Sequence, residues 1–451
     1  MVIAWSPLPR LSNKIGFNIM RIAGILLSLS ALMFTCELPL KAAENDDAPV
    51  RYAVRKGDTL INLGNRYLLR SETYKIVQRQ NRISNPFAMP VGKILVIPRN
   101  LLKYRPATAK LVSVRGRVLA GEAQASVGQV LNEGAAISTT ESSFATLLLD
   151  DGSRISLPSN TDIRIRRLRS YVLGGSLDYD FDVVKGGMQS AVTKHKSADD
   201  RYQVRTPKAV SAVRGTDFQS RYDPAADKDY AEVLEGALAV DAGPSKANDL
   251  PAGNGLALIP GGAVIREVLL PPPTLIEPGR LQADPEVSFV ANSTSLVGGF
   301  RITIAADAGF IDQVADLVIG NDKATFESIG NGNYFVRARA ISENGIEGIP
   351  VTYAFKRRLN GVNASAGQGD DGYTFKWIGD GEGIRRHHFQ LFRASVTTLP
   401  IIDEASLDSD RILISDLPPG DYFWRVGVVQ YLDGEVATNW VPVEKLTVAK
   451  P

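Results

Sequence analysis

The sequence predicts a mainly β, multidomain protein: a small module of two strands and two helices, then a strand-rich domain, then two β-sandwiches. Its 451 residues allow about three domains at roughly 150 residues each, and a 44% hydrophobic content excludes wholesale disorder. The 40 Gly and 25 Pro are typical of a chain with many turns between short strands. A motif in the last third of the chain occurs twice, which indicates a repeated β unit there.

Residues 1–43 are predicted to be a secretory signal peptide. Basic Arg21 precedes the apolar run 22–34, and the small residues Ala42 and Ala43 precede an acidic stretch. A basic start, a short apolar core and a small-residue exit are typical of a cleaved export signal, and the run is shorter than the roughly 20 residues that span a bilayer. We therefore expect the mature protein in the periplasm or cell envelope.

The single cysteine, Cys36, follows the apolar run and offers a lipid anchor as the weaker alternative. The residues before it, 33–35, are Met, Phe and Thr, whereas a lipoprotein signal usually has a small residue directly before its cysteine. Met20 is a second candidate start beside Met1. Cleavage near Ala43 would leave a mature chain without cysteine, which excludes disulfides and thiolate zinc sites.

Residues 50–104 are predicted to form a small module in the order strand, helix, helix, strand. Apolar residues at spacings of three and four along 60–67 mark one face of a helix, and Asp58 or Thr59 can cap it. A closing strand is expected over 93–97.

This module resembles the lysin-motif (LysM) family. The resemblance rests on Tyr52-x-Val54, Gly57-Asp58-Thr59-Leu60, Asn81-x-Ile83-x-Asn85-Pro86 and Leu95-x-Ile97-Pro98. The family implies a shallow groove, between the first strand–helix loop and the loop before the last strand, that binds glycans containing N-acetylglucosamine, in bacteria usually peptidoglycan. The groove residues that it implies are Gly57, Asp58, Thr59, Leu60, Ile83, Asn85, Pro86 and Phe87.

Three features of the module bear on how this resemblance is interpreted. As single residues, Asp58 and Thr59 fit a helix cap and Ile83 fits a small core equally well. Gly64 stands where the family usually has Ala, and a helical Gly is expected to cost about 1 kcal/mol. Eleven basic and two acidic residues between positions 51 and 103 would suit nucleic acid, but export argues against it. The peptide carboxylates of peptidoglycan offer an anionic partner instead.

Residues 107–245 are predicted to form a strand-rich antiparallel domain, either a sandwich or a short β-helical roll. Alternating segments are separated by turn residues, Gly186-Gly187 among them. Alternation at Ile163-Arg164-Ile165-Arg166, extended by Arg167 and Arg169, predicts a solvated arginine face or, as the functional alternative, a patch for an anionic partner. The predicted strands cover residues 111–114, 144–149, 153–157, 162–168, 181–184, 202–205, 217–221 and 231–240.

This domain resembles the periplasmic domain of the FecR family. The resemblance rests on Leu131-x-Glu133-Gly134, Asp151-Gly152-Ser153, Val204-x-Thr206-Pro207 and Val213-Arg214-Gly215-Thr216-Asp217-Phe218. Such domains commonly couple an outer-membrane receptor to a cytoplasmic sigma factor. Here a leader and a lysin motif precede the domain in place of a sigma-binding region. The resemblance therefore implies the β fold and a role in macromolecular interaction, whereas the signalling role is an alternative.

Residues 246–280 are predicted to be a linker because of their prolines and glycines. Two Ig-like or fibronectin type III-like sandwiches are predicted at 281–357 and 358–451. The segment Gly332–Ala338 returns as Gly420–Val426, an offset of 88 residues, and the unit length together with its Gly-x-Tyr strand resembles fibronectin type III domains.

We expect no catalytic residue, no metal site and no cofactor. The chain has only three histidines, His195, His387 and His388, and no Walker loop, HExxH or Gly-x-Ser-x-Gly motif. The pair Asp150-Asp151 lies next to Gly at a turn, which disfavours the remote alternative of a wall hydrolase. The hypothesis is an exported, non-catalytic envelope protein that binds peptidoglycan, with a second envelope protein as a further partner and no nucleic acid. A periplasmic regulator of FecR-type signalling is the alternative.

Overall fold

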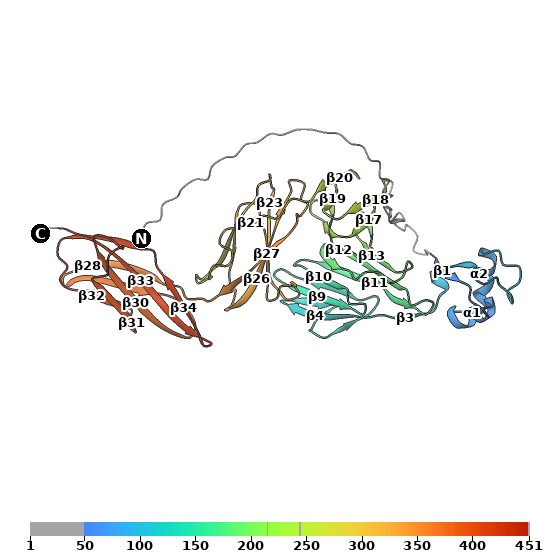
Figure 1. Ribbon diagram of the computed structural model, residues 1–451, viewed down its shortest axis with the longest axis horizontal. Coiled ribbons are helices and arrows are strands. Elements are labelled where there is room, and N and C mark those ends of the chain that lie inside the picture. The colour runs from blue at the N-terminus through green and yellow to red at the C-terminus, as the bar shows by residue number, and fades with distance from the viewer. Residues whose placement is uncertain (1–48, 214, 243–244, 450–451) are drawn as a thin grey trace, which may run out of the picture. The chain divides into compact units, whose positions relative to one another are not determined.

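The computed structural model describes residues 49–213, 215–242 and 245–449, and its fold is mainly β, as predicted (Figure 1). The predicted signal peptide 1–43, with Cys36 and Met20, lies outside the described residues. In the part of the chain that is described, no helix is long and apolar enough to span a membrane.

The small module has the predicted order of strand, helix, helix, strand. Strands β1 and β2 pair antiparallel, with Val50 opposite Ile97. The core of the module is completed from outside it, because Tyr171 and Leu173 of the following domain belong to the same buried cluster as Leu68 and Leu102. The elements are β1 (Val50–Ala53), α1 (Leu60–Tyr67), the 3-10 turn η1 (Ser71–Thr73), α2 (Tyr74–Gln80), β2 (Ile94–Ile97) and the 3-10 turn η2 (Arg99–Leu101).

Gly64 is required by packing, and the cost expected for it is offset by a close helix contact. A Cβ at this position would lie 2.8 Å from the carbonyl oxygen of Ser71 and 3.2 Å from the Cβ of Tyr74. Only a residue without a side chain lets α1 approach the second helical segment this closely.

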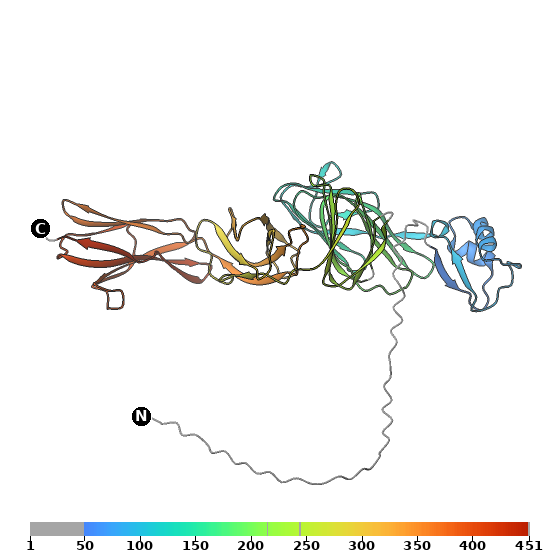
Figure 2. The same cartoon turned by 90° about the horizontal axis from the view of Figure 1, so that it is seen from above.

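Residues 104–268 form eighteen strands joined by hydrogen bonds into a closed barrel, the green part of the ribbon in Figure 2. The pairings confirm the predicted antiparallel pattern, with one parallel pair, β12 with β13. The closed barrel takes the place of the predicted sandwich or β-helical roll. The strands are β3 (Tyr104–Pro106), β4 (Ala109–Arg115), β5 (Val118–Ala120), β6 (Ala123–Gln124), β7 (Val130–Leu131), β8 (Ala136–Thr139), β9 (Phe144–Leu149), β10 (Arg154–Leu157), β11 (Asp162–Tyr171), β12 (Leu177–Ala191), β13 (Arg201–Arg205), β14 (Val210–Val213), β15 (Asp217–Asp223), β16 (Lys228–Glu235), β17 (Ala237–Ala242), β18 (Ser245–Pro251), β19 (Asn254–Leu258) and β20 (Val264–Val268).

The long strand β12 replaces the turn predicted at Gly186-Gly187. Its first half pairs with β11 and β13, and its second half pairs with β10 and β15. Gly186 has φ +77°, and a Cβ there would lie 2.4 Å from the hydroxyl of Thr161. The glycine therefore lets one strand pass from one set of partners to the other, which a sequence pattern cannot distinguish from a turn.

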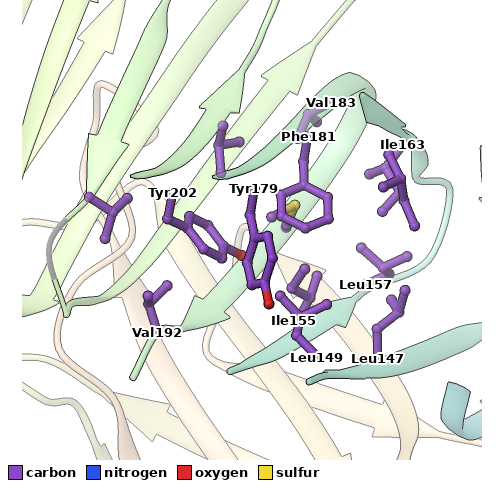
Figure 3. Close-up of a cluster of buried hydrophobic side chains, with 14 of the residues drawn as sticks. Leu147, Leu149, Ile155, Leu157, Ile163, Tyr179, Phe181, Val183, Val192 and Tyr202 are labelled. Atoms are coloured by element: carbon purple, nitrogen blue, oxygen red, sulfur yellow. The ribbon is translucent and has the colours of Figure 1, made fainter. Parts of the chain in front are cut away.

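Aromatic residues fill the centre of this domain (Figure 3). The rings of Phe181 and Tyr202 lie 5.4 Å apart, and Phe218 meets Tyr202 edge-on at 6.3 Å. Tyr179 is 1% exposed and packs on the same ring. The aliphatic side chains around them come from β9, β10, β11 and β12, among them Leu147, Leu149, Ile155, Leu157, Ile163 and Val183.

The prediction of a linker over 246–280 is wrong for most of its length. Strands β18, β19 and β20 occupy residues 245–268, and they pair with β17, β16 and β19 respectively. Leu250, Leu256 and Leu258 are buried in the domain core. The central domain thus extends well beyond its predicted end.

Two sandwiches follow, each made of two facing sheets. The first pairs the sheet β21-β22-β25 with β24-β23-β26-β27, and the second pairs β28-β29-β32 with β31-β30-β33-β34, where β35 also pairs with β33. Their strands are β21 (Thr274–Leu275), β22 (Val287–Asn292), β23 (Gly299–Ala305), β24 (Gln313–Ile319), β25 (Lys323–Phe326), β26 (Gly332–Ile341), β27 (Val351–Arg357), β28 (Asn363–Gly369), β29 (Gly372–Ile378), β30 (Ile384–Arg393), β31 (Ile402–Leu407), β32 (Arg411–Ile414), β33 (Gly420–Leu432), β34 (Glu435–Trp440) and β35 (Glu444–Val448).

The repeated Gly-x-Tyr motif forms the same hydrogen bond in both sandwiches. The Tyr334 hydroxyl donates to the carbonyl of Gly330 at 3.1 Å, and the Tyr422 hydroxyl donates to the carbonyl of Pro418 at 2.7 Å. A tyrosine that bonds back to the chain a few residues upstream is the corner found in Ig-like sandwiches. The repeat in the sequence is thus a repeat in structure.

The central domain and the first sandwich share a buried network of ion pairs, which we call the charged junction: Arg221, Glu232, Arg301, Asp316, Arg339 and Glu347. Glu347, from the loop between β26 and β27, lies 2.7 Å from Arg301 Nη1 through its Oε1. Its backbone N–H donates to Glu232 Oε1 at 3.2 Å, which ties the sandwich loop to β16. Glu347 is 2% exposed, so these charges are balanced by one another rather than by water.

Candidate functional site

The two loops implied as groove walls lie against each other in the small module. The N–H of Leu60, at the start of α1, donates to the carbonyl of Pro86 at 2.8 Å. The end of β1 is fixed beside them, because Val54 N–H donates to the Lys93 carbonyl at 2.9 Å and Gly92 N–H donates to the Val54 carbonyl at 2.8 Å. Backbone hydrogen bonds therefore bring together segments that lie about thirty residues apart.

The first loop is a tight turn built on Gly57 and Asp58. Gly57 has φ +87° and is exposed, and a Cβ there would meet no atom within 4 Å. The Asp58 carboxylate accepts from the N–H of Arg55 at 2.7 Å and from the Tyr52 hydroxyl at 2.8 Å. Burial, followed by the bond to Asp58, raises the pKa of Tyr52 to about 12, so its phenol stays protonated as the donor. At Gly57 the backbone of the turn is therefore left open to solvent.

Thr59 caps α1, whereas Leu60 points inward. The Thr59 Oγ1 accepts from the N–H of Asn62 at 3.0 Å, which confirms the capping prediction for this residue. The Leu60 side chain is 2% exposed and belongs to the module core. Any contact of Leu60 with a ligand would have to go through its backbone.

The second loop exposes an aromatic ring beside a buried isoleucine. Asn85 Oδ1 accepts from the N–H of Phe87 at 2.9 Å and so fixes the turn. Phe87 is 68% exposed, while Ile83 is 8% exposed and packs into the core. Of the eight residues that the family resemblance implies, Gly57, Asn85 and Phe87 are exposed, Asp58, Thr59 and Pro86 are half-buried, and Leu60 and Ile83 are buried.

Asn81 holds the second loop to the sheet, a role that the motif alone did not indicate. Its side-chain amide donates to the carbonyls of Val77 and Val96 at 2.8 Å each, and its Oδ1 accepts from the Val96 N–H at 2.7 Å. The side chain thus joins the end of α2 to β2. The sequence signal that could have revealed this role is the place of Asn81 in the family motif, two residues before Ile83.

A basic hollow lies on the α2 side of the module. It has a volume of about 470 Å³ and shares Ile83 with the candidate groove. Sequence reasoning predicted an excess of positive charge without placing it. The hollow is lined by Tyr74, Lys75, Gln78, Arg79, Arg82 and Ile83.

The carboxylates and histidines considered for catalysis have other local partners. Asp150 accepts from the backbone and hydroxyl of Thr108, and Asp151 accepts from those of Ser153. His388 lies 2.5 Å from Asp403. Within residues 49–213, 215–242 and 245–449, no group of three or more His, Cys, Asp or Glu side chains could hold a metal ion.

Two family models match the chain. The model described as "LysM domain" matches residues 52–98, and the model described as "FecR protein" matches residues 135–239. Both resemblances drawn from the sequence are confirmed for these segments. LysM domains bind peptidoglycan or chitin-like glycans, and both families are typical of envelope or periplasmic proteins. No curated protein matches the chain.

Similarities to solved structures are weak. A putative anti-sigma factor from Parabacteroides distasonis is 19% identical over 30% of this chain, with a TM-score of 0.25, and the match covers only 59% of that protein. A segment of two fibronectin type III domains of chicken tenascin is 12% identical over 38% of this chain and 98% of its own length, with a TM-score of 0.19. The fibronectin(III)-like modules of Clostridium thermocellum CbhA are 14% identical over 39% of this chain and 94% of their own length, with a TM-score of 0.18. Such low scores support no conclusion about function.

Proposed function

We propose that this protein is an exported, non-catalytic envelope protein that binds peptidoglycan through its lysin-motif module. The observation that supports this best is the bond from Leu60 N–H to the Pro86 carbonyl, which joins the two candidate loops inside the segment that the family model matches. The residues proposed for N-acetylglucosamine binding are Gly57, Asp58, Thr59, Leu60, Ile83, Asn85, Pro86 and Phe87, of which the buried Leu60 and Ile83 support the loops from within the core.

The chemistry of these loops suits an N-acetylated sugar. Gly57 presents open backbone, and Asn85 keeps a side-chain amide at the surface. Amide groups of this kind can exchange hydrogen bonds with the N-acetyl group. The exposed ring of Phe87 can cover the apolar face of a sugar ring. Lys75, Arg79 and Arg82 would add attraction to the peptide carboxylates of the polymer.

Sedimentation of the full chain with purified peptidoglycan tests the proposal. The full chain is needed because Tyr171 and Leu173 complete the core of the module. We expect Phe87→Ala to weaken binding by about tenfold, the size of one lost aromatic contact of about 1.4 kcal/mol. Tyr431→Ala, which removes another exposed aromatic from the second sandwich, is the matched control and should bind normally.

A comparison of salt concentrations separates sugar recognition from charge. Attraction between exposed charges fades as the Debye length falls from about 10 Å at 0.1 M salt to about 3 Å at 1 M, whereas contacts to the neutral N-acetyl group persist. We expect binding to survive at 1 M and soluble chitin oligomers to compete. If binding vanishes at 1 M and the oligomers never compete, the module is only a basic patch and the proposed groove is wrong.

The remaining domains are proposed to engage a second envelope protein, with no nucleic acid partner and no cofactor. We place the domain limits at 50–104, 104–268, 270–357 and 358–449.

The match of residues 135–239 to the FecR family favours a second candidate function, a periplasmic regulator of cell-surface signalling. Recovery of an outer-membrane receptor and an anti-sigma system with the protein from crosslinked envelopes would favour the regulator, and recovery of wall proteins alone would favour the scaffold.

A further inference from the structure

A cleft beside the charged junction, between the central domain and the first sandwich, contains two arginines that nothing in the proposed function uses. Its volume is about 200 Å³. We call it the arginine cleft and define it by Arg154, Ser156, Gln189, Asp217, Phe310 and Arg337.

One wall belongs to the central domain and carries Arg154. This residue begins β10, its side chain is half-buried, and among the described residues it makes no side-chain hydrogen bond or ion pair. Ser156 on the same strand and Gln189 on β12 add neutral polar groups beside it. A guanidinium carries five N–H donors, so Arg154 offers an unused positive fork to the cleft.

The other wall belongs to the first sandwich and carries Arg337. Its guanidinium lies over the Phe310 ring, 3.7 Å from the ring centre, and its Nε donates to the Thr352 hydroxyl at 3.4 Å. No carboxylate among the described residues forms an ion pair with it. Burial, followed by the charge of Arg339, lowers the pKa of Arg337 to about 10. The carboxylates of Asp217 and Asp307 oppose this shift only in part, so an anion in the cleft would further stabilise the charge of Arg337.

The loop that supports Arg337 is rigid and strained. Phe310 is 1% exposed and has φ +55°, a backbone region that a bulky residue rarely adopts. The Asp307 carboxylate holds the loop by accepting three backbone N–H groups, those of Gly309, Ile311 and Asp312. Asp312 in turn pairs with Arg115 of the central domain at 2.8 Å. Strain that the surrounding contacts maintain is typical of functional sites.

The balance of charge indicates the class of ligand. Two arginines and one acid, Asp217, line the cleft, and burial raises the pKa of Asp217. A net charge near +1 suits a monoanion better than a phosphate dianion, which would meet Asp217 as a like charge. A carboxylate also matches the planar fork of a guanidinium.

We propose that the arginine cleft binds a small monoanionic ligand, whose carboxylate is held between Arg154 and Arg337. Since each arginine comes from a different domain, the ligand would bridge the central domain and the first sandwich. This site is separate from the glycan-binding loops, so either proposal can fail without the other.

Calorimetric titration of the full chain tests the site with three probes: the N-acetylated dipeptide N-acetylglycylglycine, which is a monoanion, its neutral C-terminal amide, and inorganic phosphate. We expect the free dipeptide to bind and to raise the midpoint of thermal unfolding, since a ligand that bridges two domains stabilises the folded state. The amide lacks the carboxylate and should bind at least tenfold more weakly. Equal binding of the amide, no binding of the dipeptide, or tighter binding of phosphate would each overturn the assignment.

Variants connect the binding to the two arginines. Arg154→Gln and Arg337→Gln should each lower the affinity for the dipeptide by tenfold or more. Arg117→Gln, which removes an exposed arginine elsewhere in the central domain, should leave it unchanged. Because Arg154 has no side-chain partner among the described residues, Arg154→Gln should leave the midpoint of thermal unfolding unchanged. The affinity of Arg154→Gln for the dipeptide therefore tests the site even if Arg337→Gln folds poorly. An equal loss of affinity in Arg117→Gln would show that the dipeptide responds only to overall positive charge, which would contradict the proposed site.

Discussion

The small module exposes its polar and aromatic groups to solvent, whereas the charged junction buries its charged groups against one another. In the module, backbone amides and an exposed ring lie at the surface, where Phe87 is 68% exposed and Gly57 faces open space. At the junction, Glu347 is 2% exposed and is surrounded by guanidiniums. Changes at the module's loops should therefore affect binding with little effect on stability, whereas changes at the junction should affect stability with little effect on binding.

The largest effect is expected from Glu347→Gln. The change removes a buried carboxylate and leaves Arg301, Arg221 and Arg339 without its charge. Removal of one partner of a buried ion pair typically destabilises by about 3–5 kcal/mol. Urea unfolding followed by circular dichroism should show the loss. Glu343→Gln, in the same loop but exposed, is the control and should change stability by less than about 0.5 kcal/mol. Peptidoglycan binding that fell as steeply as stability would break the proposed contrast.

The same residue predicts a dependence on pH. Burial opposes ionisation of Glu347, but the charges of Arg301, Arg221 and Arg339 outweigh it and lower its pKa from 4.5 to about 2. Because the folded pKa lies below the unfolded value, the stabilisation is present above about pH 4.5 and is lost as the pH falls toward 2. The difference in stability between the natural protein and Glu347→Gln should therefore shrink over that interval.

A smaller effect of opposite sign is expected from Asp229→Asn in the central domain. Burial raises the pKa of Asp229 to about 6, although Thr206 and the N–H of Lys208 donate to it. A folded pKa above the unfolded 3.8 means that the stabilisation is present below about pH 4 and is lost as the pH rises through 6. The variant should therefore be more stable than the natural protein at pH 8, by up to about 3 kcal/mol, and the two should converge near pH 4. Thermal unfolding at both pH values would detect this, and a constant difference would contradict it.

The smallest effects on stability belong to the small module. Thr59→Ala should destabilise it by about 1 kcal/mol through loss of the helix cap. Phe87→Ala should stay within about 0.5 kcal/mol, because the ring makes little contact with the protein. Hydrogen exchange of the α1 amides can measure both. The prediction fails if Phe87→Ala raises exchange more than Thr59→Ala does.

Sequence reasoning succeeded where the determinants are local. The order of elements in the small module follows from helical spacing, the cap at Thr59 and the turn at Gly57, all within a few residues of one another. The offset of 88 residues likewise predicted two units, which share the hydroxyl bonds of Tyr334 and Tyr422. The eight groove residues were identified by resemblance alone, and burial divides them in a way that the motif could not indicate.

Sequence reasoning failed where a residue's pairing strand or ion-pair partner lies far away in the sequence. Residues 246–268 are rich in turn-forming residues and were predicted as part of a linker, yet the neighbouring strands β16 and β17 convert them into hairpins. Of the predicted solvated arginine face, only part is solvated. Arg167 pairs with the buried Asp180 at 2.6 Å and Arg169 pairs with Glu133, 36 residues away. The acidic partner of an arginine cannot be inferred from the sequence of the strand that carries the arginine.

The contact of Tyr171 and Leu173 with the small module sets an order of events for a chain made from its N-terminus. Residues 50–104 emerge first, but their core stays open until the segment around 171–173 has followed, some seventy residues later. Contacts with such separation form late and slowly. Until that segment has followed, the core of the small module lacks the two side chains that complete it. Completion of the module's core therefore depends on the hairpin of β11 and β12, because Tyr171 ends β11 and Leu173 lies in the connection that follows it.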